Sequence, residues 1–353
     1  MSHKPLDVTV EIAPKARFDL VDMRRTFAAE HEALSAFSHC LYWSSHTTAG
    51  FLDRSLASRL QGQHIPNYLE TFRSIFPEGA GYEHDQLDRR SDLDAEQRAI
   101  EPRNADSHLA FMAGGLRTCV THPNHPEEHV FFVDLDGVTD GRPRKRLSRL
   151  IGFTAERQVA ATTIQVPVSS HPIDSINLKD PSLGVYEELE AFVRQSGVER
   201  GRLRVALSAG ERHSGLTVNE YETLMMRHDL AEVLKEPLRF MREKASHLLA
   251  RPRAITNRSL DYAKYDMVQI FNQLFDTFRM NESVVERLAA RVLAVPASRF
   301  LRMKRSVSLL VSDRVSEGVG RPIQGTYQSP ILVQWAKASA KQREVEVILT
   351  RFK

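Results

Sequence analysis

The first half of the sequence is organised around one stretch, Leu41-Tyr42-Trp43-Ser44-Ser45-His46-Thr47-Thr48-Ala49-Gly50. The residues at 36–43 are aromatic and apolar without a helical period, which predicts a buried strand. Residues 51–60 are predicted to begin a helix. A strand end leading into a helix presents backbone N–H groups to an anion, and His46, Thr47 and Thr48 add a titratable base and two hydroxyls. We expect a phosphate or carboxylate site here; the alternative is that these residues form only a turn or a helix cap.

The composition is that of an ordinary globular protein. The 353 residues favour two domains, and apolar residues make up 42% and charged residues 26% of the chain. A net charge of +3 gives no general attraction to nucleic acid or to an anionic membrane. No apolar run approaches the roughly 18–20 residues that cross a bilayer, and residues 1–5 lack the apolar core of a signal peptide. Only Cys40 and Cys119 are present, both in apolar surroundings, so we expect no disulfides and a cytoplasmic location.

The first half of the sequence predicts a series of strands and helices in a definite order. Strands are expected at 8–12, 17–22, 36–43, 117–120, 129–135 and 146–153, and helices at 22–34, 52–62 and 66–75. Residues 77–104 are rich in Gly, Asp and Arg, and we expect a long surface loop that carries function.

The second half repeats this order. Strands are expected at 162–168, 172–177, 203–208, 214–220, 307–312, 331–335 and 345–352, a helix at 186–196, and a long helical region at 221–250 and 263–292. A period of about 150 residues indicates a duplicated domain rather than a solenoid. The boundary falls near 154–161, which gives a first domain of residues 1–157 and a second of residues 158–353.

Three motifs of the first half resemble, in the same order, those of the YjbQ-like proteins, which are described as secondary thiamine-phosphate synthases. They are His46-Thr47-Thr48-Ala49-Gly50, then Tyr82-Glu83-His84-Asp85, then Asn104-Ala105-Asp106-Ser107-His108-Leu109. Two further family motifs, Asn-Glu and Trp-Gln, are lost from this half. Arg54-Ser55 and Glu127-Glu128 stand in their places.

The second half keeps what the first half has lost. It contains Gly215-Leu216-Thr217-Val218-Asn219-Glu220 and Gly325-Thr326-Tyr327-Gln328. It lacks the histidines, because Glu211-Arg212-His213 stands where His-Thr-Thr would be and the equivalent of His108 falls near Ala297. Losses that complement one another suggest one composite site built from both halves.

The resemblance implies an α+β fold, here two tandem YjbQ-like domains, each with a β-sandwich-like core flanked by helices. It also implies a homo-oligomer, since family members usually assemble as trimers. The reaction it implies is a transfer of the thiamine-phosphate-synthase type on a small phosphorylated or diphosphorylated substrate.

His46, His84 and His108 lie in separate motifs that the fold could bring together, and ten of the fourteen histidines precede residue 130. With the carboxylate of Asp85 beside them, they could hold a divalent metal such as Zn, Mn or Mg and leave one position open. Alternatively, one of these histidines is a general base near neutral pH and the others bind phosphate oxygens. The histidines at 122, 125 and 129 receive no role and can be surface residues.

The remaining candidates would complete the site. Glu220 would add a catalytic carboxylate from the second half, for a metal or a cationic substrate, unless it only begins a helix. Asn104 would hold substrate or orient His108, unless it is only a helix N-cap. Substrate contacts are also expected from Thr47, Thr48, Asn219 and Gln328.

The basic run Arg142-Pro143-Arg144-Lys145-Arg146 invites a nucleic-acid interpretation. Because no aromatic residues are interleaved and there is no net basic excess, a solvated strand edge is the better account. The sequence has neither a Walker loop nor a dinucleotide fingerprint, so we expect no nucleotide cofactor.

Two hypotheses about function follow. The first is an enzyme that acts on a small phosphorylated molecule, by transfer or by metal-assisted phosphoryl transfer or hydrolysis. The second is a non-catalytic ligand-binding or scaffold protein, derived from a duplication whose sites have decayed. The enzyme is favoured if Asn219, Glu220 and Gln328 lie in the same cleft as the three histidines.

Overall fold

The computed structural model describes residues 4–353, except 61–63, 77, 80–81, 83, 90–93, 140, 171–173, 221–302, 315–317 and 335. The helical region predicted at 221–250 and 263–292 therefore lies outside the described residues, as do Glu83, Ala297 and the end of the strand predicted at 331–335. Within the described ranges, no helix is both long enough and apolar enough to cross a membrane.

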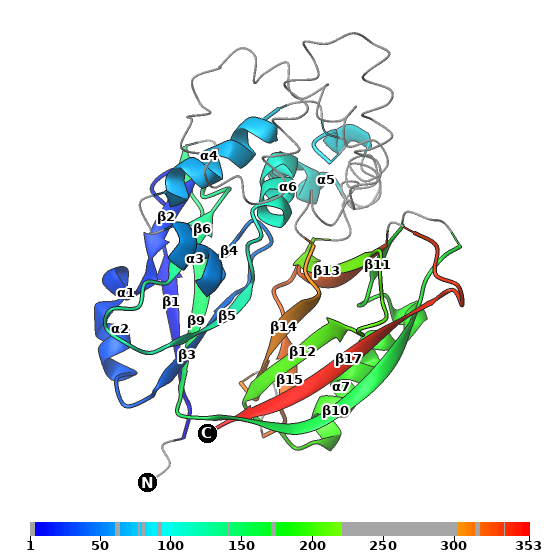
Figure 1. Ribbon diagram of the computed structural model, residues 1–353. Coiled ribbons are helices and arrows are strands. Elements are labelled where there is room, and N and C mark those ends of the chain that lie inside the picture. The colour runs from blue at the N-terminus through cyan, green and yellow to red at the C-terminus, as the bar shows by residue number, and fades with distance from the viewer. Residues whose placement is uncertain are drawn as a thin grey trace.

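In the described part of the chain, strands up to residue 153 pair with one another and form the group at the left of Figure 1. One antiparallel sheet has the strand order β1-β9-β3-β5, a second has the order β2-β6-β4, and β7 pairs with β8. The strands are β1 (Leu6–Ile12), β2 (Asp19–Asp22), β3 (His39–Ser44), β4 (Ala49–Phe51), β5 (Cys119–Pro123), β6 (Phe131–Asp134), β7 (Val138–Thr139), β8 (Arg142–Pro143) and β9 (Arg146–Phe153).

Strand β3 lacks the usual alternation of buried and exposed residues because both of its faces are covered. Cys40 and Tyr42 belong to the core of the first half. Leu41 and Trp43 belong to a separate apolar cluster that includes Leu310 from the far end of the chain. The sequence pattern without a period therefore reflects a strand between two cores.

The helices of the first half are short, apart from α4. They are α1 (Met23–Thr26), α2 (Ala28–Ala33), α3 (Arg54–Leu60), α4 (Ile65–Ile75), α5 (Ala95–Ile100) and α6 (Ala105–Ala113), with a 3₁₀ turn η1 (Leu87–Arg89). All nine residues of α6 are buried, including Asp106, Ser107 and His108. A helix covered on every side holds its polar side chains in fixed positions, which is what a functional site requires.

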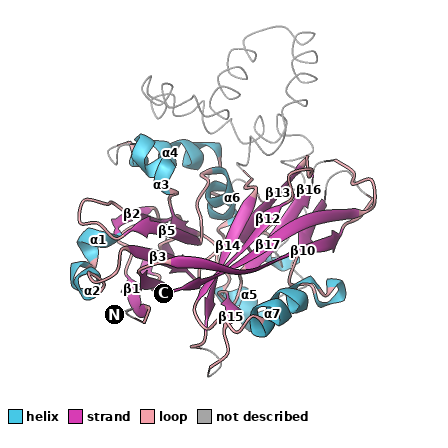
Figure 2. Ribbon diagram, turned by 60° about the horizontal axis from the view of Figure 1, so that its bottom comes forward, coloured by secondary structure: helices cyan, strands magenta, loops and turns pink. Residues whose placement is uncertain are grey.

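Strands from residue 156 onward form the second group, in sheets of order β10-β17-β12-β14-β15 and β11-β16-β13 (Figure 1). They are β10 (Glu156–Pro167), β11 (Asp174–Asn177), β12 (Gly201–Leu207), β13 (Ser214–Asn219), β14 (Ser306–Ser312), β15 (Arg321–Ile323), β16 (Ser329–Gln334) and β17 (Gln342–Phe352). After the 3₁₀ turn η2 (Pro181–Leu183), helix α7 (Val185–Gln195) buries Val185, Leu189 and Val193, a stripe at four-residue spacing, in the core of these sheets. Figure 2 shows α7 against this second group, away from α4 and α6.

The two groups of strands meet through side chains. Phe153 stacks on Phe352 with ring centroids 4.2 Å apart, within the cluster that also holds Leu41, Trp43 and Leu310. Beside this apolar contact, Arg149 pairs with Asp7 and donates to Ser312 Oγ at 3.0 Å. Apolar packing and a buried polar link together hold the two halves in one orientation.

The structure confirms an α+β fold and places a regular element at nearly every predicted range within the described residues. Three predictions were wrong in detail. The helix at 22–34 is broken at Phe27. The segment 77–104 is not only a surface loop, because Tyr82 and His84 are fully buried. Strand β4 follows the His-Thr-Thr segment, and a helix begins only at Arg54. The domain boundary at 157/158 stays a prediction; it falls inside β10.

Two buried histidines, His31 and His122, flank Tyr42 in the core of the first half. His122, which received no role from the sequence, is therefore not a surface residue. His31 Nε2 lies 2.8 Å from the Tyr42 hydroxyl, and the ring of His122 meets that of Tyr42 edge-on. Burial lowers the pKa of both imidazoles below the ordinary value of 6.5. Below pH 6.5 these imidazoles become protonated in the unfolded chain but stay neutral in the folded protein. Protonation therefore favours the unfolded state, and the stability present above pH 6.5 is lost as the pH falls.

We therefore expect the free energy of unfolding of the wild type to fall more steeply between pH 7 and pH 5 than that of His31→Gln. Urea unfolding at several pH values measures both slopes, and subtracting them removes the contribution of other titrating groups. The exposed His125→Gln is the matched control and should keep the wild-type slope. Equal slopes for the wild type and His31→Gln would contradict the expectation.

Candidate functional site

The His-Thr-Thr segment forms a tight connection between two sheets. Ser44, at the end of β3, donates from Oγ to the carbonyl of Ala49 at 2.8 Å and accepts from the N–H of His46 at 3.3 Å. This closes the loop and places His46, Thr47 and Thr48 on the wall of a cavity. The alternative that the threonines cap a helix is wrong, because β4 follows them directly.

The cavity has a volume of about 210 Å³ and is built by both halves of the chain. The first half contributes the His-Thr-Thr loop, the segment from Gln97 to Asn104, and the start of β9. The second half contributes Glu220, directly after β13, and Tyr327. The volume lies below the range of roughly 300–1,000 Å³ that holds drug-sized ligands, so the cavity suits a small molecule.

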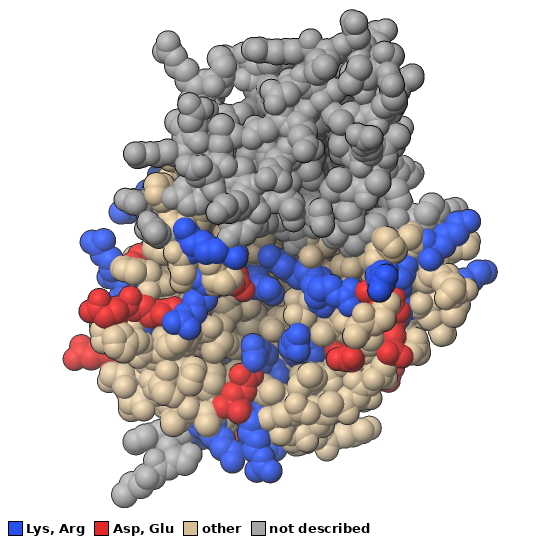
Figure 3. All heavy atoms as spheres, viewed as in Figure 1, with Lys and Arg blue, Asp and Glu red and all other residues tan. Residues whose placement is uncertain are grey.

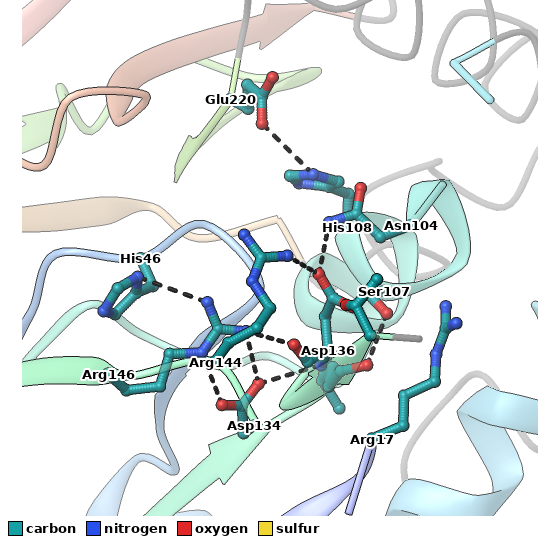
Figure 4. Close-up of polar contacts among 12 residues, drawn as sticks. Arg17, His46, Asn104, Ser107, His108, Asp134, Asp136, Arg144, Arg146 and Glu220 are labelled. Carbon is teal, nitrogen blue, oxygen red and sulfur yellow. Dashed lines mark hydrogen bonds and ion pairs between the residues drawn. The ribbon is translucent and has the colours of Figure 1, made fainter. Parts of the chain in front are cut away.

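Two arginines of the basic run, for which the sequence favoured a solvated strand edge, belong to this site. Arg146 is buried and donates two hydrogen bonds to the carboxylate of Asp134, from Nε at 2.7 Å and from Nη2 at 2.9 Å. Arg144 pairs with the buried carboxylate of Asp136 and lines the cavity (Figure 4). The solvated-edge interpretation was therefore wrong for Arg146, while the Arg144 side chain is 36% exposed and paired with Asp136. That interpretation holds for Arg142 and Lys145, whose side chains are exposed.

The geometry around His46 suits a neutral imidazole. Its Nε2 accepts from the backbone N–H of Leu147 at 3.0 Å, and Nη1 of Arg146 lies 3.5 Å from its Nδ1. Burial, followed by the charges of Arg146 and Arg144, lowers the pKa of His46 to about 3. The Nε2 of His46 is therefore an acceptor that fixes the loop to β9, and the proton of the neutral ring is carried by Nδ1.

The other two predicted histidines meet a carboxylate from the second half. Ligand atoms of His84, His108 and Glu220 all lie within 4.8 Å of one another, and all three residues are buried. His108 Nε2 is 3.4 Å from Oε2 of Glu220 (Figure 4). Two imidazoles and one carboxylate are a donor set found in zinc enzymes, so these residues fit a divalent cation.

The predicted metal ligands are thus brought together only in part. Within the described residues, neither His46 nor Asp85 belongs to the group with mutual distances below 4.8 Å. Asp85 lies behind His84, with Oδ1 2.8 Å from His84 Nδ1 and also accepting from the N–H of Ala105 at 3.1 Å. A carboxylate in this place orients an imidazole toward a metal and does not bind the metal itself.

The predicted substrate-binding amides have three different roles. Asn104 lines the cavity and donates from Nδ2 to Asp136 at 2.7 Å, which leaves Oδ1 without a partner among the described residues. It precedes α6 as expected for an N-cap, yet its side chain makes no capping hydrogen bond. The Oδ1 atom can accept a hydrogen bond from a ligand.

Gln328 has no polar group left for substrate. Its Nε2 donates to the carbonyls of Ser44 and His46, at 2.8 and 2.7 Å, and its Oε1 accepts from the N–H of Gly325 at 2.9 Å. A Cβ added to Gly325 would lie 1.8 Å from the carbonyl oxygen of Ser45. The second half is therefore held against the His-Thr-Thr loop at a position where only glycine fits. Asn219 is also turned toward the protein, with Oδ1 2.7 Å from His108 Nδ1.

Four charged residues of the site were missed by sequence reasoning: Asp134, Asp136, Arg144 and Arg146. Their spacing was the available signal. Two acids at alternate positions stand at the end of a buried strand, and two arginines at alternate positions stand at the start of another, so each pair points to one face where the strand ends meet. Over the face seen in Figure 3, basic and acidic side chains are interspersed.

The sequence matches no protein-family model and no curated protein. Nine solved chains match in structure. A YbjQ-like protein of unknown function from Sulfolobus solfataricus P2 is 14% identical, with a TM-score of 0.29 over 56% of this chain and 99% of that one. A hypothetical protein from Aeropyrum pernix K1 is 18% identical, with a TM-score of 0.30 over 42% and 99%.

A third match is an uncharacterised conserved protein of the YjbQ/UPF0047 family from Clostridium acetobutylicum. It is 12% identical, with a TM-score of 0.25 over 40% of this chain and 97% of that one. Two of these three descriptions carry a YbjQ or YjbQ designation.

Proposed function

We propose that the chain is an enzyme that binds a small phosphorylated compound in this cavity, beside a divalent cation held by His84, His108 and Glu220. One observation carries the proposal. A carboxylate from the second half, Glu220, meets two buried imidazoles of the first half and itself lines a cavity that also contains an anchored arginine.

Each group has a defined part in this proposal. Arg144, fixed at one end by Asp136, presents its remaining N–H groups to phosphate oxygens, and Thr47 and Thr48 add neutral donors. When bound, a divalent cation neutralises phosphate charge and polarises the bond that reacts. Asn104 Oδ1 accepts a hydrogen bond from the substrate. These parts serve phosphoryl transfer, hydrolysis or a transfer of the thiamine-phosphate-synthase type.

We also infer that the chain is a tandem pair of YjbQ-like domains, consistent with a repeated pairing register. Gly50 of the His-Thr-Thr segment pairs with Val133 on β6, and Gly215 pairs with Val333 on β16. Gly50 lies on β4, which follows β3 of the larger sheet in the first half. Gly215 lies on β13, which follows β12 of the larger sheet in the second half. The difference in residue number between Val133 and Val333 also relates Glu128 of the first half to Gln328 of the second, so these two residues occupy equivalent positions.

Residues that stand in place of the lost motifs form ion pairs. Arg54 donates from Nε to Glu128 at 2.8 Å in the first half, and Glu211 pairs with Arg343 at 2.8 Å in the second. Ion pairs thus occupy the places from which site residues are missing. The retained residues of the two halves meet one another: His46, Asn104 and Glu220 line one cavity, and His108 contacts Asn219 and Glu220. This arrangement favours a single composite site over two decayed ones, and an enzyme over a scaffold.

The test is phosphate binding by an Arg144→Gln variant. Because a charge-assisted hydrogen bond contributes about 1.5–3 kcal/mol, we expect the affinity for inorganic phosphate to fall by roughly 10- to 100-fold. Isothermal titration of the zinc-loaded protein measures this. Arg142→Gln, at an exposed position in the same basic run, is the matched control and should bind as the wild type does.

Equal affinities for the wild type and Arg144→Gln would place phosphate elsewhere. Absence of phosphate binding by the wild type, with and without zinc, would rule out the proposed substrate class.

A further inference from the structure

The amide of Asn219 can be oriented without ambiguity. Its Oδ1 lies 2.8 Å from the backbone nitrogen of Glu220, which is always a donor. The atom facing this N–H must therefore be the oxygen, because the amide nitrogen would place two donors against each other. Asn219 is fully buried, so no water replaces this contact.

The orientation of Asn219 decides the protonation of His108. Oδ1 of Asn219 is also 2.7 Å from Nδ1 of His108, and an amide oxygen can only accept. Nδ1 of His108 must then carry a proton. In the neutral imidazole, Nε2 is left with a lone pair.

That lone pair faces a second acceptor. Nε2 of His108 is 3.4 Å from Oε2 of Glu220, and the neighbouring imidazole of His84 is held in the same sense by Asp85 at its Nδ1. Facing acceptors in a buried place repel unless a proton or a metal cation lies between them. A proton would join only His108 and Glu220, whereas a metal cation can be bound by all three side chains at once.

We propose that Asn219 is a positioning residue, which fixes the Nδ1–H tautomer of His108 and so directs its Nε2 lone pair to the cation beside Glu220. The inference rests on the cation of the proposed function. It reassigns Asn219, which the sequence suggested as a substrate contact. It also explains why Asn219 and Glu220 act as one unit: the backbone of Glu220 orients the amide that orients the histidine.

The test is the ¹⁵N NMR spectrum of the full chain with labelled histidine, recorded with a chelator. The resonances of His108 are assigned by their loss in His108→Gln. We expect Nδ1 to be the protonated nitrogen in the wild type. In Asn219→Leu we expect this preference to be lost and zinc affinity to fall by roughly 10- to 100-fold. Asn219→Asp, whose carboxylate accepts from the same two N–H groups, should restore the tautomer.

Each outcome decides the matter. An unprotonated Nδ1 in the wild type would overturn the proposal, and this needs no variant to fold. So would a tautomer that persists in Asn219→Leu, or an unchanged zinc affinity in that variant. If the tautomer behaves as expected but the wild type binds no zinc, the orientation of His108 by Asn219 stands, and the cation of the proposed function falls.

Discussion

Replacing Glu220 by glutamine is expected to weaken zinc binding by roughly 100-fold or more, since loss of a supporting residue alone costs about 10- to 100-fold. Glu220 supplies the carboxylate of the three-residue group, and glutamine keeps its size while removing its charge. Elemental analysis of the purified protein and isothermal titration with zinc measure the effect. The wild type should also gain about 2.7 kcal/mol in unfolding free energy at a zinc concentration 100 times Kd, and the variant should not.

The matched control is Glu101→Gln, which removes another carboxylate from the wall of the same cavity. It should bind zinc as the wild type does. His84→Gln and His108→Gln should lose zinc with Glu220→Gln, whereas His46→Gln should retain it, because the nitrogens of His46 face Leu147 and Arg146. Zinc lost from His46→Gln but kept in Glu220→Gln would show that the cation lies elsewhere.

The Arg146→Met variant is expected to lose about 3–5 kcal/mol of unfolding free energy. Arg146 and Asp134 are buried, with side-chain exposures of 3% and 0%, so removing the guanidinium leaves an uncompensated charge in the interior. Nη2 of Arg146 also donates to the carbonyl of Asp136 at 2.6 Å, so the same change loosens the loop that positions Arg144. Urea unfolding gives the stability.

Lys145→Met is the neighbouring control. Lys145 pairs with Glu11 at the surface, with side-chain exposures of 76% and 48%, and its loss should change stability by no more than about 0.5 kcal/mol. The double variant Asp134→Asn/Arg146→Met should recover part of the loss, because it removes both charges. A loss below about 1 kcal/mol in Arg146→Met would show that the pair is not the buried anchor described above.

These expectations change the roles that the motifs first suggested. The motif histidines do not form one set, because His84 and His108 converge on Glu220 while His46 is turned to β9. Gln328 and Asn219 act on the protein: one holds the backbone of His46 and the other holds the ring of His108. Two residues expected at the substrate thus hold other residues of the candidate site in place.

Much of the fold followed from local patterns. Alternation of apolar residues predicted β1, and the predicted range 146–153 coincides with β9. Helix α7 begins and ends within one residue of the predicted range 186–196. These features depend on neighbours along the chain, since strand and helix periods are properties of a few consecutive residues. The motifs likewise singled out His108, Asn219 and Glu220, because each stands in a short segment of recognisable residue order.

The tertiary structure alone decided which of these residues meet. His108 and Asn219 are 111 positions apart in sequence, and no local rule predicts that they share a hydrogen bond. Likewise, the run at 142–146 was interpreted as a solvated strand edge because no aromatic residues are interleaved and the chain has no net basic excess. Asp134 and Asp136 pair with Arg146 and Arg144 only once β6 and β9 have folded together. Local propensity determined the elements of this protein, and long-range burial and charge pairing determined its site.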